Sequence, residues 1–189
     1  MLSAATAHAL SEALIDTERA AEQVGWDAPP QLLGMFTRLD TTIEIAPVPL
    51  HPETWRARDP LKPDAYIPVT AILDVLTAYF TAPLTPAWLS EWLHEDGRTP
   101  VGFAFLCEGR ETLNSPGQRR SGLQAVANAG DNAIRSLSAL DVDGRYYHVL
   151  RRRGSATASA NTDHDPTPLI RQTTLGACLY RLRHLARPA

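Results

Sequence analysis

The run VGFAFLCE at residues 101–108 constrains the fold more than any other part of the chain, because it has no charged side chain before its last residue. A strand with one solvated face alternates apolar and polar residues, whereas a continuously apolar strand is covered on both faces. The run therefore predicts a central strand with structure packed on either side. Cys107 within it and Cys178 near the C-terminus are both in apolar segments, which predicts buried, reduced thiols and a cytoplasmic location.

Two further pairs of alternating segments predict β-hairpins. The first spans residues 31–48 and turns at Asp40-Thr41. The second spans residues 134–153 and turns at Asp143-Gly144, a dipeptide that accepts the positive φ angles of a tight hairpin turn. Together with the central strand they give a five-stranded, mostly antiparallel sheet.

Helical periodicity predicts four helices. Residues 4–24 form an amphipathic pattern that Gly25 ends. Residues 68–80 and 86–94 follow, the latter with Thr85 as its N-cap, and residues 167–186 close the chain. The predicted fold class is thus α+β, in the order α-β-β-α-α-β-β-β-α.

We expect one domain over residues 1–189, with its most mobile loops near 111–132 and 155–165, where apolar periodicity is lacking. The predicted element order resembles that of profilin-like and roadblock/longin-like domains. That likeness is one of element order alone, so it implies an architecture and no activity.

Two short motifs carry a second resemblance. The segment GWDAPP at residues 25–30 resembles a GWDxPP segment of uncharacterised actinobacterial proteins. The segment DVDGRYYHVLRRRG at residues 141–154 is similar to a hairpin with an RxRG ending in such proteins. The resemblance implies no activity, cofactor or site residue.

Charge is unevenly distributed along the chain. Residues 1–96 hold 14 acidic and 5 basic side chains, a balance of −9, whereas residues 97–189 hold 7 acidic and 13 basic, a balance of +6. No stretch of about 20 predominantly apolar residues predicts a membrane span, and the N-terminus lacks the pattern of a secretory signal.

Motifs that carry chemistry are missing from the sequence. It contains no HExxH, CxxC, G-x-S-x-G or phosphate-binding glycine pattern. The cluster Asp163-His164-Asp165 is more typical of a solvated loop than of a metal site, and Glu108 and Glu111 have no second group placed near them by sequence. We therefore assign no catalytic, cofactor-binding or metal-binding residue.

A group of arginines near the last predicted hairpin is the strongest candidate for a partner-binding surface. It comprises Arg135, Arg145, Arg151 and Arg153. Alternatively, these arginines neutralise the acidic half of the chain or protect an edge strand from aggregation. Trp55, in a proline-rich segment, is either an exposed contact for a partner or a cap on the core.

These observations favour a non-enzymatic protein-interaction or regulatory domain. Its partner would be another protein, including a second copy of this chain, with no cofactor and no membrane. One alternative is a nucleic-acid-associated regulator that uses the C-terminal arginine surface, although a pI near 6.0 argues against it. The other is a hydrolase whose site is assembled from residues distant in sequence.

Overall fold

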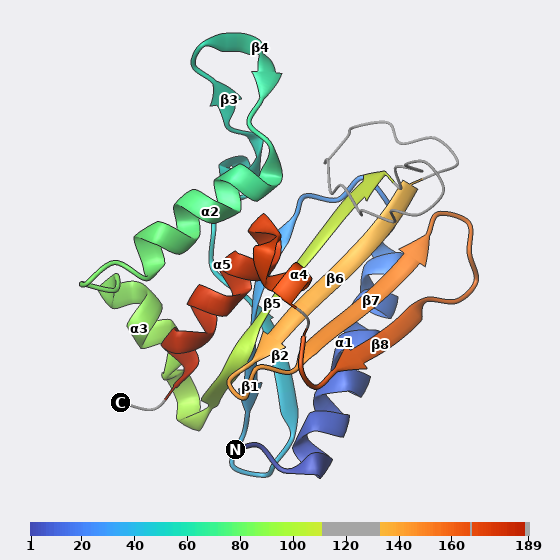
Figure 1. The fold of residues 1–189 in the computed structure, drawn as a ribbon, viewed down its shortest axis with the longest axis vertical. Coiled ribbons are helices and arrows are strands. Elements are labelled where there is room, and N and C mark those ends of the chain that lie inside the picture. Colours follow the sequence, from blue (N-terminus) through green and yellow to red (C-terminus); the bar gives the residue numbers. More distant parts are fainter. Residues whose placement is uncertain (111–132, 167, 188–189) are drawn as a thin grey trace.

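A six-stranded antiparallel sheet organises the protein, whose computed structural model describes residues 1–110, 133–166 and 168–187. The strands lie in the order β2-β1-β5-β6-β7-β8 (Figure 1). Their bounds are β1 (Gln31–Thr37), β2 (Ile43–Pro47), β5 (Thr99–Arg110), β6 (Ala133–Asp141), β7 (Tyr146–Arg152) and β8 (Ser159–Asp163). The α+β class and the antiparallel pairing agree with the sequence-based prediction.

Strand β5 lies in the interior of this sheet, between β1 and β6, and is buried on both faces as its composition predicts. Phe103 and Phe105 belong to the core on one face, and Ala104 and Leu106 belong to the core on the other. The continuous apolar run therefore serves two cores at once.

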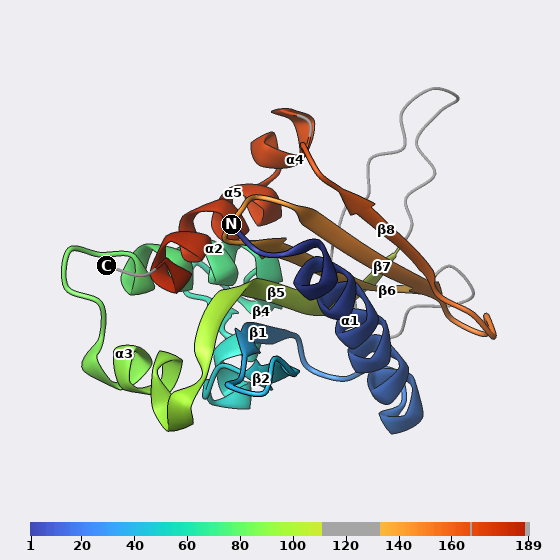
Figure 2. The same ribbon diagram turned by 90° about the horizontal axis from the view of Figure 1, so that it is seen from below.

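Helices cover the two faces of the sheet unequally (Figure 2). On one face lies α1 (Ala4–Val24), capped by the Ser3 side chain, which accepts a hydrogen bond from the Thr6 amide. On the other face lie α2 (Val69–Phe80) and α5 (Thr174–Leu182), with α4 (Pro168–Gln172) and a 3-10 turn at Arg183–Ala186; α3 (Ala87–Leu93) follows α2. No helix in the described part of the chain is long and apolar enough to cross a membrane.

The sheet has six strands rather than the five predicted, because β8 lies inside the segment 155–165 that the sequence predicts to be a loop. The sequence of β8, SANTD, has no apolar alternation to reveal it. As an edge strand it pairs with β7 through backbone groups, which any residue except proline supplies. The other predicted loop, 111–132, lies outside the described residues.

A two-stranded ribbon is the second element absent from the prediction. Strands β3 (Arg58–Asp59) and β4 (Lys62–Tyr66) form it between β2 and α2. It stands away from the main sheet beside the first turn of α2 (Figure 1). The prolines of this segment suggest irregular structure, yet the ribbon closes with an Ile67 amide to Ala57 carbonyl hydrogen bond of 2.9 Å.

The observed element order also departs from the predicted one at the helices. The closing helix is divided at Thr173, whose hydroxyl accepts a hydrogen bond from the Gly176 amide at 3.0 Å and so caps α5. Helix α3 begins after Pro86 with no side-chain cap, so the prediction of Thr85 as N-cap is wrong. Pro86 instead supplies a fixed φ at the helix start.

Gly102 marks a bulge in β5, where the register with β1 steps from Met35–Gly102 to Phe36–Pro100. A Cβ at this position would overlap the Leu140 carbonyl oxygen and lie 2.8 Å from the Asp141 Cα. Both are backbone atoms of a paired strand, so neither can move aside.

We therefore predict that Gly102→Ala lowers the free energy of unfolding by about 1–3 kcal/mol, through overpacking of the sheet. Urea denaturation measures the effect. Asn161→Ala on the exposed edge strand is the control and should stay within about 0.5 kcal/mol of the wild type. Equal stability of the two variants would contradict this account of the bulge.

Candidate functional site

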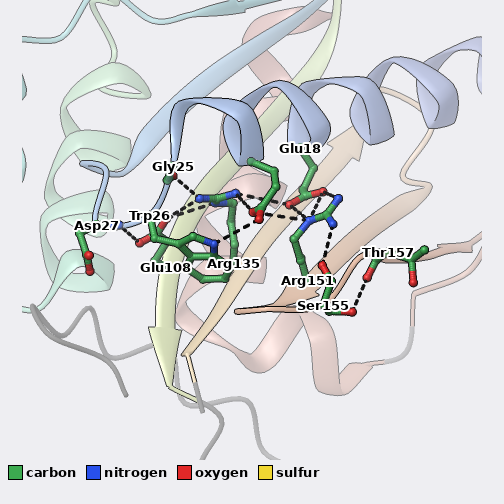
Figure 3. A network of polar contacts seen from close by, with 10 residues as sticks. Glu18, Gly25, Trp26, Asp27, Glu108, Arg135, Arg151, Ser155 and Thr157 are labelled. Carbon is green, nitrogen blue, oxygen red and sulfur yellow. Dashed lines mark hydrogen bonds and ion pairs between the residues drawn. The ribbon is translucent and has the colours of Figure 1, made fainter. Parts of the chain in front are cut away.

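Three charged side chains form a row across the face of the sheet that α1 covers. Glu108 on β5 is the register partner of Arg135 on β6, and Arg135 is the register partner of Arg151 on β7. Register partners point to the same face, so the two guanidinium groups lie side by side. Glu18 on α1 approaches this row from above (Figure 3). Glu22, four residues further along the helix, pairs with Arg135.

Glu18 lies between the two arginines. Its carboxylate accepts hydrogen bonds from Arg151 Nε and Nη2, each at 2.8 Å to the nearer oxygen, and lies 3.6 Å from Arg135 Nη1. Arg135 Nη1 donates to Glu22 at 2.8 Å, and Arg135 Nη2 donates to Glu108 at 2.9 Å. The Glu18 carboxylate therefore separates the two guanidinium groups, and Arg135 has two further carboxylate partners.

The GWD segment after α1 completes this network. Gly25 has φ +113°, and its carbonyl oxygen accepts a hydrogen bond from Arg135 Nη2. The Trp26 ring lies with its centroid 4.4 Å from the Arg135 guanidinium carbon, and the Asp27 amide donates to Glu108 at 2.7 Å. Arg153 reaches the same segment, 3.2 Å from the Asp27 carboxylate. Here the structure gives a physical role to the first residues of the GWDAPP motif.

The centre of the network is removed from water, whereas Glu22 and Glu108 at its edge are partly exposed. The side chains of Glu18 and Arg135 are 0% and 1% exposed, and that of Arg151 is 7% exposed. The hydrogen bonds that Arg151 donates to Glu18 are the main cause that raises the pKa of Arg151 above its ordinary value. Burial of these charges is tolerated because every one has an oppositely charged partner at hydrogen-bond distance.

A cleft of about 230 Å³ adjoins the network between α1 and strands β1 and β5. Its walls are mostly small apolar side chains, including Ala20, Ala21 and Val24, with Glu108 and Arg135 at one side. All three guanidinium nitrogens of Arg135 already donate to protein oxygens. The cleft therefore offers no cation to a phosphate or carboxylate ligand, and the arrangement is suited to holding α1 on the sheet.

The structure separates the arginines that the sequence groups together. Arg135 and Arg151 are interior residues, so their burial gives no support to the prediction that these two bind a partner. Arg145 pairs with Asp141 at 3.2 Å and with Asp143 at 3.1 Å. The alternative that these arginines neutralise the acidic half of the chain agrees with the contacts of Arg135, Arg151 and Arg153.

Trp55 is also an interior residue. Its side chain is 6% exposed, and its ring lies 5.5 Å from that of Phe105 on the central strand. Capping of the core, rather than exposure to a partner, is the interpretation that its burial supports.

A second polar cluster lies on the opposite face of the sheet, where sequence analysis identifies nothing. His148 Nε2 lies 3.0 Å from Ser136 Oγ, and the Tyr146 hydroxyl donates to Ser138 Oγ at 3.0 Å. The signal that could have revealed it is the alternation of polar residues at 136 and 138 on one strand of the Asp-Gly hairpin and at 146 and 148 on the other, with Ser138 directly opposite His148. Burial lowers the pKa of His148 below its ordinary value near 6.5.

A serine–histidine pair is the starting arrangement of a nucleophilic site. Ser136, however, is only 2% exposed, and no carboxylate is among the hydrogen-bond partners of His148 in the described part of the chain. No group of three or more metal-ligating side chains occurs among the described residues either. The pair therefore satisfies two polar groups of the core and gives no support to hydrolysis.

Comparisons with protein-family models, with curated proteins and with solved structures find no significant match to this chain. The resemblances to actinobacterial motifs and to roadblock/longin-like domains therefore stay predictions. Function is argued below from the arrangement of the residues alone.

The buried network generates a first prediction at this site. Glu18→Gln keeps the side-chain shape but leaves Arg151 without its main countercharge, which should cost about 3–5 kcal/mol in the free energy of unfolding. Urea denaturation tests this. Glu12→Gln, on the exposed side of the same helix, is the matched control and should change little. The double variant Glu18→Leu with Arg151→Met should regain most of the loss, since no charge then stays unpaired.

His148 generates a second prediction. Because its pKa is lowered in the folded state, protons bind preferentially to the unfolded chain as the pH falls below about 6.5, and stability is lost over that range. His148→Gln should remove this part of the pH dependence. Denaturation of both proteins between pH 7.5 and 5 measures the difference, with Asn161→Gln on the neighbouring strand as a non-titrating control. Parallel curves for wild type and His148→Gln would refute the assignment.

Proposed function

We propose that this chain is a non-enzymatic protein-interaction domain that acts through the apolar side chains gathered between residues 61 and 88. Six of the nine large hydrophobic side chains that are exposed in the described residues lie in this segment. We call them the apolar ridge, and its members are Leu61, Tyr66, Val75, Tyr79, Leu84 and Trp88. Exposed apolar groups that collect in one region are typical of interaction surfaces.

The ridge is supported from beneath by the core. The Phe80 ring is buried and lies 5.7 Å from the rings of both Tyr79 and Trp88, so these two exposed aromatic side chains are anchored on one buried residue. Val75, one helical turn before Tyr79, is 69% exposed and extends the same side of α2. Rigid aromatic side chains with an exposed edge are favourable contacts for a partner, because little side-chain entropy is lost on binding.

The nucleic-acid alternative draws less support from the contacts of the arginines. Arg135 and Arg151 donate hydrogen bonds to carboxylate and carbonyl oxygens inside the protein. Arg145 forms ion pairs with two aspartates. Phosphate binding requires guanidinium groups that can exchange water and counterions for phosphate. The apolar ridge is thus the observation that carries the proposal.

A capture experiment from native lysate tests this function. The tagged wild-type chain should retain one or more proteins, counting an untagged copy of itself, and Val75→Glu with Tyr79→Glu should retain none of them, because a charge buried at an apolar contact is strongly unfavourable. Ala5→Glu, on the exposed first turn of α1, is the control. Identical bound proteins for all three, with unchanged melting curves, would refute the proposal.

A further inference from the structure

We infer that the partner of the apolar ridge is a second copy of this chain, bound with the two α2 helices packed antiparallel about a two-fold axis. This inference rests on the proposed function and names the occupant of the same surface. It follows from three features of the ridge: the spacing of residues on α2, the position of the other members at the two ends of that helix, and the distribution of charge.

The outer side of α2 has the spacing of a helix-packing seam. Ala71, Val75 and Ala78 are exposed and follow one another at steps of four and three residues. This is the interval at which residues repeat along the contact line of paired helices. The opposite side of α2, with Ile72, Leu73, Thr77 and Phe80, is buried in the core. Small residues on the seam allow a second helix to approach closely.

The remaining members of the ridge lie at both ends of α2. Leu61 and Tyr66 precede the helix on the β3–β4 ribbon, which projects beside its first turn (Figure 1). Leu84 and Trp88 follow its last turn. Antiparallel pairing sets the start of one helix beside the end of the other, so the ribbon of each copy meets the α3 end of its partner. A single two-fold arrangement thus brings the two ends of the ridge together, which a partner helix alone does not.

The charges on this surface are compatible with self-association. Asp74 is the only charged residue of α2, and it is paired with Arg181 of α5. A two-fold interface brings the same patch of both copies together, so an unpaired charge there would face its own kind. The ribbon has two basic and two acidic residues, Arg58, Asp59, Lys62 and Asp64, and is therefore balanced. By contrast, the exposed carboxylate of Glu91, one turn after Trp88, would be repelled by an anionic lipid surface, which disfavours a membrane as the partner.

Sedimentation equilibrium of the purified chain provides the first measurement. We expect a reversible dimer, and Val75→Glu should raise its dissociation constant by at least about a hundredfold by placing a charge on the seam. Ala5→Glu should leave the dimer unchanged. Circular dichroism and melting curves of each variant establish that the fold is retained. A wild-type chain that stays monomeric at about 100 µM would overturn the inference.

Cysteine cross-linking tests the antiparallel orientation separately. Ala71→Cys at the start of α2 and Ala82→Cys just past its end should form a mixed disulfide when the two proteins are combined. In the antiparallel pair, the two copies of residue 71 are separated by most of the helix length, about 16 Å, beyond the roughly 7 Å limit for a disulfide. Cys107 and Cys178 do not interfere, because both are buried and burial raises the pKa of the Cys107 thiol to about 12.

The outcomes separate this inference from the proposed function. Mixed disulfides in excess over those of Ala71→Cys alone support the antiparallel dimer, and an excess of Ala71→Cys homodimers overturns it. If the wild-type chain is monomeric but captures another protein from the lysate, and Val75→Glu with Tyr79→Glu fails to capture it, the inference is overturned and the proposed function stands. A monomeric chain that captures nothing overturns both. Retention on lipid vesicles that the ridge variant loses, without a dimer, assigns the ridge to a membrane and overturns both.

Discussion

Five charged side chains between α1 and the sheet hold the two layers of this protein in register. Only Leu10, Leu14 and Glu18 of the 21 residues of α1 are buried, so apolar burial alone gives the helix few anchor points. The pairing of Glu18 with Arg151 adds a directional contact that specifies both the rotation and the axial position of the helix. Because the pair is shielded from water, its geometry is specific. Its net contribution to stability is smaller than its short distances suggest, because the cost of removing both charges from water offsets much of their attraction.

This network changes the meaning of the uneven charge along the chain. The acidic N-terminal part and the basic C-terminal part meet inside the protein, where Glu18 and Glu22 face Arg135 and Arg151. A charge imbalance between two halves of a sequence is therefore no guide to the surface when the halves fold against each other. Among the described residues, Arg135 and Arg151 therefore add nothing to the charge of the surface.

The elements that the sequence predicts well are those whose own residues carry the signal. The apolar run of β5 and the Asp-Gly hairpin of β6 and β7 are local patterns, and both are confirmed. The sequence does not predict strand β8, because its pairing depends on the backbone of β7 rather than on its own side chains. The interior position of Arg135 could not be predicted either, since its carboxylate partners are 27 and 113 residues away along the chain.

At the base of the β3–β4 ribbon, where the chain leaves and re-enters the body, the Ile67 amide donates a hydrogen bond to the Ala57 carbonyl. A short turn between those two residues would reconnect the chain without disturbing either core, as neither Leu61 nor Tyr66 is part of one. We therefore expect insertions and deletions in the ribbon to disturb the sheet less than changes in the strands themselves. Changes in the ribbon, natural or engineered, could in this way alter the binding partner of the protein while its fold is retained.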